Sequence, residues 1–176
     1  MTAPPLTVAP AEPGEFPVLG DIGVRAYRSA GYTDAGLNDE YADALRAVEE
    51  RTTGGGTVLA ARTGAGAVGS VTLAPAGTRW ADLARTGEVE VRMLSVAPHA
   101  QGRGVGESLM RSAETWARDH GYQALVLSVV SSGGRSTPHR LYERLGYRRD
   151  PSRDYVGWWH PRPRMWFYEL PLTGSR

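Results

Sequence analysis

The stretch QGRGVGESL, from Gln101 to Leu109, places three glycines between Gln101 and Gly106. It follows a segment that alternates as a strand does and precedes a segment with helical spacing of apolar residues. A glycine-rich turn that enters a helix leaves the first helical N–H groups unpaired and lets a phosphate approach them closely. The stretch therefore predicts an anion site at a strand-to-helix junction.

Two familiar phosphate loops do not match this stretch. The P-loop needs a lysine, and all 20 basic residues of this chain are arginine. The dinucleotide fingerprint G-x-G-x-x-G fails because Glu107 stands where its last glycine is required. What remains is the pattern Q-x-x-G-x-G, formed by Gln101, Gly104 and Gly106. By itself this pattern also fits a flexible turn without a ligand.

The composition is that of an ordinary globular protein. The 176 residues suit a single domain over 1–176, with 41% hydrophobic and 22% charged residues. A formal net charge of +1 argues against a general nucleic-acid binder, so we expect no nucleic-acid partner.

The chain contains no cysteine, which excludes disulfides and a cysteine nucleophile. The sequence MTAPPLTVAP at its start lacks a basic and apolar leader, and no run approaches the length needed to span a bilayer. We therefore expect a cytoplasmic protein without a membrane partner.

Strands and helices are mixed along the chain, which indicates an α/β fold. Strands are expected at 6–10, 57–62, 67–73, 88–96, 124–130, 147–149 and 165–170. Helices are expected at 15–27, 39–51, 105–120 and 138–146. Gly121 is placed to stop the third helix and Pro98 to end the strand before the glycine stretch.

Two segments carry a resemblance to a known family. EVRMLSVAPHAQGRGVGESLM (90–110), followed after another strand by HRLYERLGY (139–147), resembles the Gcn5-related N-acetyltransferase superfamily, GNAT. The resemblance implies the GNAT fold, which is a single mixed, mostly antiparallel sheet of about six to seven strands. About four helices flank this sheet, and its central strand pair is splayed. It also implies acetyl-CoA as co-substrate and an amine as acceptor.

The resemblance also implies where the coenzyme binds. In this family the Q-x-x-G-x-G loop holds the pyrophosphate, the preceding strand meets the pantetheine arm, and the N–H of Val96 polarises the thioester carbonyl. Many relatives carry an asparagine seven residues before Tyr142, where this chain has Arg135. Either Arg135 contacts a coenzyme phosphate or its loop takes another course. The predicted coenzyme-binding residues are Leu94, Ser95, Val96, Gln101, Gly102, Arg103, Gly104, Val105, Gly106, Glu107, Arg135 and Tyr142.

An amine that attacks a thioester needs a general base, because a lysine-like amine has a pKa near 10.4. Glu88 and Glu90 both qualify, since they lie on one face of the predicted strand. Glu90 stands eleven residues before Gln101, the spacing at which some GNAT members carry a catalytic glutamate, so we favour Glu90. The alternative is a structural carboxylate paired with Arg92 or another arginine.

The departing thiolate needs an acid, and Tyr142 matches the tyrosine that the family often places close to the coenzyme sulfur. The alternative is a half-buried helix aromatic. Leu141, Leu145 and Tyr147 are interpreted as packing residues, and His139 as a surface histidine near a helix start.

Aromatic residues gather near the end of the chain, in and after the last inter-strand loop. That loop often borders the acceptor site in this superfamily, but the aromatics could equally cover the sheet or form a homodimer interface. The residues concerned are Trp158, Trp159, Arg162 and Trp166.

The leading hypothesis is an N-acyltransferase that moves an acetyl or related acyl group from acetyl-CoA to a primary amine of a small molecule or a peptide. Direct attack in a ternary complex is expected, because no cysteine can carry an acyl intermediate. The alternatives are a non-catalytic acyl-CoA-binding or regulatory module with the same fold, and a nucleic-acid-binding domain.

Overall fold

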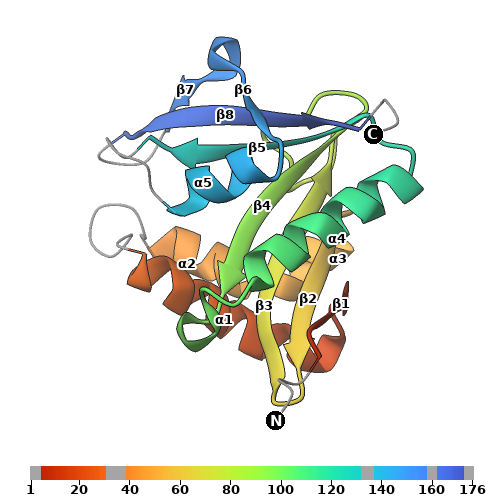
Figure 1. Ribbon diagram of the computed structural model, residues 1–176, viewed down its shortest axis with the longest axis vertical. Helices are drawn as coiled ribbons and strands as arrows, with labels where there is room; N and C mark the ends of the chain where they lie inside the picture. The colour runs from red at the N-terminus through yellow and green to blue at the C-terminus, as the bar shows by residue number, and fades with distance from the viewer. Residues whose placement is uncertain (1–4, 31–38, 132–136, 158–161, 173–176) are drawn as a thin grey trace.

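One mixed sheet organises the protein, which the computed structural model describes over residues 5–30, 39–131, 137–157 and 162–172 (Figure 1). In this part of the chain the sheet has eight strands in the order β1-β2-β3-β4-β5-β8-β6, and β7 also pairs with β8. The strands are β1 (Thr7–Pro10), β2 (Thr57–Thr63), β3 (Gly66–Pro75), β4 (Glu88–Val96), β5 (Ala124–Val130), β6 (Arg148–Arg149), β7 (Tyr155–Val156) and β8 (Arg164–Pro171).

Five α-helices and three short 3₁₀ helices occur within the described residues. They are α1 (Phe16–Ser29), α2 (Asp39–Arg46), α3 (Val48–Thr53), α4 (Val105–Asp119) and α5 (Thr137–Arg144), with η1 (Pro13–Glu15), η2 (Pro98–Ala100) and η3 (Pro151–Arg153). The single helix predicted over 39–51 is two helices, because Ala47 has a ψ of 50° and interrupts the helical path. None of the helices in the described ranges could span a membrane.

The helices cover both faces of the sheet. A Cβ added to Gly23 of α1 would lie 3.7 Å from Ser95 Oγ, and one added to Gly106 of α4 would lie 3.8 Å from Val96 Cγ2. Neighbouring strand residues point to opposite faces, so α1 and α4 pack on opposite sides of β4. Figure 1 shows α4 crossing the sheet, with α1, α2 and α3 lying together apart from it.

The central strands β4 and β5 separate part-way along their length. They are the parallel pair in an otherwise antiparallel sheet, and their pairing extends from Glu88 and Ala124 only as far as Glu90 and Val126. Beyond this point β4 continues to Val96 and β5 to Val130 without pairing with each other, and the two ribbons diverge in Figure 1. The mixed, mostly antiparallel sheet and its splayed central pair are therefore confirmed.

A β-bulge changes the direction of side chains in β4. Ser70 pairs with Ser95 and Thr72 pairs with Arg92, so two steps along β3 oppose three along β4. Met93, inside this step, has a φ of 53°. The extra residue places the side chains of Arg92 and Met93 on the same face, the one covered by α1 to α3.

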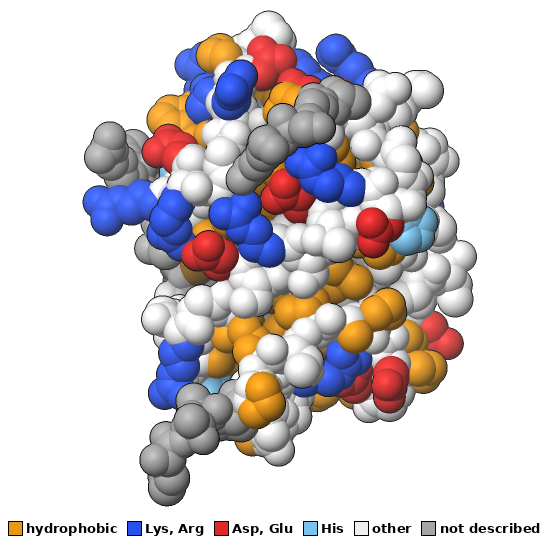
Figure 2. Space-filling view, turned by 45° about the vertical axis from the view of Figure 1, so that its right-hand side comes forward, with side chains coloured by type: hydrophobic (Ala, Val, Ile, Leu, Met, Phe, Trp, Pro, Cys, Tyr) orange, Lys and Arg blue, Asp and Glu red, His pale blue; other side chains and the backbone are white. Residues whose placement is uncertain are grey.

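The charge on the surface is of mixed sign. On the face seen in Figure 2, arginines lie among aspartates and glutamates above and below a band of hydrophobic side chains. This mixture of the described side chains differs from the one-sign basic surface that is typical of nucleic-acid binders.

Candidate active site

The glycine stretch forms the predicted turn between β4 and α4. Gly102 and Gly104 have φ values of 73° and 79°, in the left-handed region that side chains rarely adopt. A Cβ at either position would meet nothing within 4 Å, so backbone conformation, and not lack of space, favours glycine there. Residues 101–104 are exposed, and α4 begins at Val105.

The start of α4 presents free backbone donors. The first helical hydrogen bond runs from Ser108 N to Gly104 O at 2.9 Å. Gly104, at the N-cap, has no side chain to cap the helix. The N–H groups of Val105, Gly106 and Glu107 thus have no acceptor among the described residues, and the helix dipole adds partial positive charge there. This geometry suits an anion such as a pyrophosphate.

Val96 connects this loop with the gap between β4 and β5. Ala97 N donates to Val68 O of the neighbouring β3 at 2.8 Å. Since successive residues of a strand direct their polar groups to alternate edges, the N–H and C=O of Val96 face the splayed side. Gln101 Nε2 donates to Val96 O at 3.1 Å and so fixes the loop to the strand.

The remaining predicted coenzyme residues lie on β4 and beyond it. Ser95 and Leu94 are on opposite faces of β4. Ser95 is buried and donates from Oγ to Met93 O at 3.1 Å on the α1 side. Leu94, the preceding residue, is half-buried and packs against the core. Arg103 is exposed, and Glu107 pairs with Arg144 of α5 at 3.3 Å. Arg135 lies outside the described residues.

Tyr142 is on α5 and is 8% exposed. Its ring centroid lies 5.8 Å from that of Tyr147 and 6.3 Å from that of Tyr168. Leu145 and Tyr147 are buried in the core, and Leu141 packs against it, as expected of packing residues. Burial raises the pKa of Tyr147 well above its usual value.

His139 is not the surface histidine that the sequence suggested. It is 2% exposed, and its Nδ1 lies 2.9 Å from the Tyr168 hydroxyl and its Nε2 3.2 Å from Val130 O. The reason is the helix period, because His139 and Tyr142 are three residues apart and share the buried side of α5.

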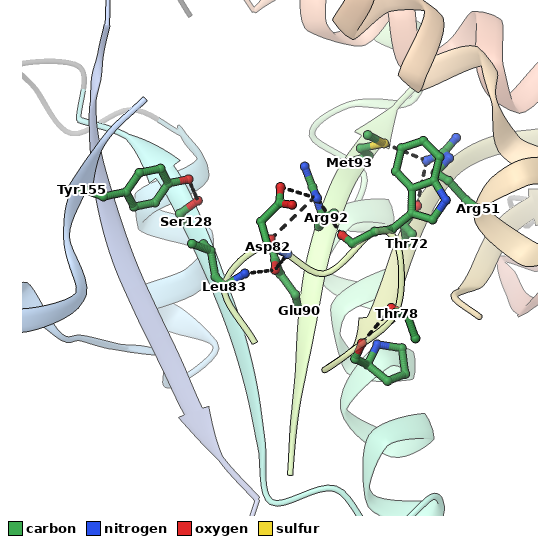
Figure 3. A network of polar contacts seen from close by, with 12 residues as sticks. Arg51, Thr72, Thr78, Asp82, Leu83, Glu90, Arg92, Met93, Ser128 and Tyr155 are labelled. Carbon is green, nitrogen blue, oxygen red and sulfur yellow. Dashed lines mark hydrogen bonds and ion pairs between the residues drawn. The ribbon is translucent and has the colours of Figure 1, made fainter. Parts of the chain in front are cut away.

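Glu90 is a buried carboxylate with two different oxygen environments (Figure 3). It is 3% exposed, and Oε2 accepts backbone N–H groups from Asp82 at 2.7 Å and Leu83 at 2.6 Å. Its Oε1 faces Arg92 Nε at 3.7 Å. Burial raises the pKa of Glu90, and the opposing effects of Arg92 and the two amides do not cancel it. A raised pKa suits a general base that works near neutral pH.

Glu88 has the opposite electrostatic character. Arg153 donates to its two oxygens at 2.8 and 3.0 Å, and Arg85 N donates at 2.8 Å. Burial alone would raise the pKa of Glu88, but these hydrogen bonds and charges outweigh burial and lower it. Of the two glutamates, Glu90 is therefore the better base.

Two hydroxyl groups that the sequence analysis did not identify lie beside Glu90. Ser128 of β5 and Tyr155 of β7 place their oxygens 2.9 Å apart. Val126 pairs with Glu90, so Ser128, two residues further along, points to the same face of the sheet. Figure 3 shows this pair on one side of Glu90 and Arg92, with Met93 and Arg51 on the other.

Trp166 packs against the core, as expected of an aromatic that covers the sheet, which is one of the three roles left open for the C-terminal aromatics. Arg149 lies over its ring at 4.7 Å, and His139 meets the ring edge-on at 5.1 Å. Arg162 is exposed with a φ of 58°. Trp158 and Trp159 lie outside the described residues.

The fold agrees with the comparisons to known proteins. Residues 23–147 match the model of the Acetyltransferase (GNAT) family. The match covers more than half of the chain, so this protein belongs to the GNAT acetyltransferase family, whose co-substrate is acetyl-CoA.

Two curated relatives match over a shorter segment. N-acetylaspartate synthetase from Danio rerio is 36% identical over 69 residues, which are 39% of this chain and 24% of that protein. Mycothiol acetyltransferase from Rhodococcus opacus is 37% identical over 60 residues, 34% of this chain and 19% of that protein. The chain thus matches a quarter or less of the length of these relatives.

Solved structures match over nearly the whole chain. A GNAT-family protein from Desulfovibrio desulfuricans gives a TM-score of 0.75 at 18% identity, covering 96% of this chain and 100% of the other. The yncA protein from Salmonella typhimurium, solved with acetyl-CoA, gives 0.70 at 21%, covering 97% and 95%. The ribosomal-protein-S18-alanine N-acetyltransferase from Escherichia coli gives 0.71 at 15%, covering 98% and 97%. At these identities the likeness establishes the fold.

Proposed function

We propose that this protein transfers an acetyl group from acetyl-CoA to a primary amine by direct attack in a ternary complex. The carrying observation is that β4 and β5 stop pairing at Glu90, and that the Val96 N–H on the unpaired part of β4 faces the β5 side, close to the free N–H groups at the start of α4. The name of one curated relative, N-acetylaspartate synthetase, refers to an N-acetylated amine, which supports an amine acceptor.

In the proposed reaction the pyrophosphate binds the N–H groups at the start of α4, and the thioester carbonyl accepts the N–H of Val96. Glu90 Oε1 takes a proton from the acceptor ammonium, and the amine nitrogen then forms a bond to the acyl carbon. The C–S bond breaks, and the thiolate takes a proton from the Tyr142 hydroxyl. The attacking nitrogen loses its second proton, and this proton restores the Tyr142 hydroxyl. The products are the acetylated amine and free coenzyme A.

The test is a panel of amines with acetyl-CoA, in which thiol release is followed and the acetylated product is identified by mass. Release that depends on one amine, with a product heavier by one acetyl group, would support the proposal. Binding of acetyl-CoA with no turnover on any amine would instead favour the non-catalytic module, which would bind the coenzyme through the same loop and tolerate the loss of Glu90 and Tyr142. The single domain over 1–176, the cytoplasmic location and a homodimer stay predictions.

A further inference from the structure

Arg51 on α3 is a buried cation that forms no ion pair with a carboxylate of the described residues. It is 2% exposed, and its guanidinium donates to Thr72 Oγ1 at 2.7 Å and to Leu45 O at 2.8 Å and contacts Met93 Sδ at 3.1 Å. Its Nε has no hydrogen-bond partner, and no carboxylate lies within ion-pair distance among the described residues. Burial lowers the pKa of Arg51 to about 10, so the group stays charged at neutral pH.

A buried charge of this kind costs free energy, because neutral partners replace only part of the hydration it loses. Leu45 lies in the last turn of α2, whose dipole stabilises a cation to some extent. An apolar residue of similar size would fill the same space without the cost. Because its burial is costly, the charge of Arg51 is expected to serve a function.

The position of Arg51 indicates that use. Its partner Thr72 pairs with Arg92 across the sheet, and Met93 belongs to the bulge of β4. The Arg51 guanidinium thus packs against the part of β4 that follows Glu90, on the face of the sheet that carries the Glu90 side chain. Figure 3 shows Arg51, Met93 and Thr72 beside Arg92.

Arg92 offers a free donor at this place. Its Nη1 donates to Trp80 O at 2.6 Å and to Asp82 Oδ2 at 2.7 Å, and its Nε faces Glu90. The Nη2 group makes no hydrogen bond within the described part of the chain. The side chain as a whole is 21% exposed, so part of it is open to solvent.

Before an acceptor binds, the charges of this cluster sum to zero. Arg51 and Arg92 oppose the carboxylates of Glu90 and Asp82. The ammonium of a simple amine adds one positive charge, which stays in the site when its proton moves to Glu90. An anionic group on the acceptor would offset this added charge both before and after the proton transfer.

We propose that the acceptor carries a carboxylate near its amine, as a free amino acid does, and that Arg92 Nη2 binds this carboxylate in the positive potential of Arg51. This inference rests on the proposed function, because it assigns the acceptor of the same site. It disfavours simple amines and the α-amine of a protein N-terminus, which has an amide in place of the carboxylate.

The test compares matched acceptors by thiol release, namely the standard L-amino acids and their α-carboxamides. For the best amino acid we expect kcat/KM at least about tenfold above that of its carboxamide, mainly through KM. Equal or better turnover of carboxamides or simple amines would overturn this inference and leave the proposed function intact. No thiol release with any amine would remove the proposed function and this inference with it.

A variant of Arg51 tests the role of its charge. Arg51→Met should raise KM for the amino acid about tenfold and leave KM for the carboxamide unchanged. The fold should be preserved. Arg46→Met, which removes an exposed arginine of α2, is the matched control and should change neither. Equal losses on both acceptors would mean that Arg51 is structural only.

A second measurement does not depend on folding of a variant. The deaminated acid of the best acceptor should inhibit the wild type competitively against that acceptor, and its amide should inhibit at least about tenfold more weakly. Equal inhibition by acid and amide would contradict the proposal.

Discussion

The carboxylate of Glu90 accepts a hydrogen bond of 2.6 Å from the backbone N–H of Leu83, seven residues earlier in the chain. The same oxygen accepts the N–H of Asp82, and Arg153 holds the carbonyl of Leu83 at 2.7 Å. The loop between β3 and β4 is therefore fastened to the strand by the side chain that we propose as the base. Oε2 holds the loop, and Oε1 is the oxygen that can take the proton.

Two substitutions of Glu90 should separate these roles. Glu90→Gln keeps a carbonyl oxygen for the two amides, so its free energy of unfolding should stay within about 1 kcal/mol of wild type. Its kcat/KM should fall on the order of 10²-fold, since the base is lost. Glu90→Ala should lose about 1–3 kcal/mol for each buried N–H left without an acceptor. Urea unfolding and thiol release measure the two effects, and full activity of Glu90→Gln would leave Glu90 as a loop anchor only.

The pH dependence of stability should carry the signature of the raised Glu90 pKa. A carboxyl with a raised folded-state pKa contributes stability that is present below its unfolded pKa, about 4.3, and is lost as pH rises through the folded pKa. The stability of wild type relative to Glu90→Gln should therefore decrease from about pH 4 toward pH 7. Urea unfolding of both proteins across this range measures the difference.

Glu88→Gln is the matched control for this titration, because Glu88 lies on the same face of β4 and has a lowered pKa. The stability that Glu88 contributes should be present above its unfolded-state pKa and lost as pH falls through its folded-state pKa. This direction is opposite to that of Glu90. If the Glu90 difference stays constant with pH, the raised pKa is wrong.

The sequence predicted the elements whose signals are local. Gly104 and Gly121 bracket α4 as expected, because positive φ at a helix end depends on the turn itself. The splay of β4 and β5 followed from the family resemblance, since no residue in either strand marks the point where pairing stops. The break at Ala47 between α2 and α3 has no glycine or proline to signal it.

The residues that the sequence analysis missed depend on contacts between distant segments. Tyr155 is in a two-residue strand that exists only by pairing with β8, and its partner Ser128 is 27 residues away. The burial of His139 depends on how α5 lies against β8. Arg51 has the sequence context of a polar helix residue, and only the position of α3 under the β4 bulge makes it a buried charge.

Gly104→Glu should weaken binding of acetyl-CoA, because it adds bulk and negative charge at the N–H groups that receive the pyrophosphate. The φ of 79° also strains any side chain at this position by about 1–3 kcal/mol. Gly121→Glu is the matched control, with a φ of 76°, equally open space and a place at the other end of the same helix. Calorimetric titration should show that the affinity for acetyl-CoA falls at least about tenfold in Gly104→Glu and is unchanged in Gly121→Glu. Equal losses in both variants would indicate a general effect of strain, and unchanged binding in both would remove the loop as the pyrophosphate site.

Tyr142→Phe and Tyr147→Phe form a matched pair, because both tyrosines are buried and their rings lie 5.8 Å apart. The Tyr147 hydroxyl has no hydrogen-bond partner among the described residues, so its removal should leave activity unchanged and stability equal or up to about 1 kcal/mol higher. Tyr142→Phe should lower kcat about 10²-fold, since the thiolate then departs without an acid. An acetyl thioester with a more acidic thiol needs less help, so the Tyr142→Phe defect should shrink with such a donor. A defect of the same size with both donors would mean that Tyr142 positions the coenzyme and does not protonate its sulfur.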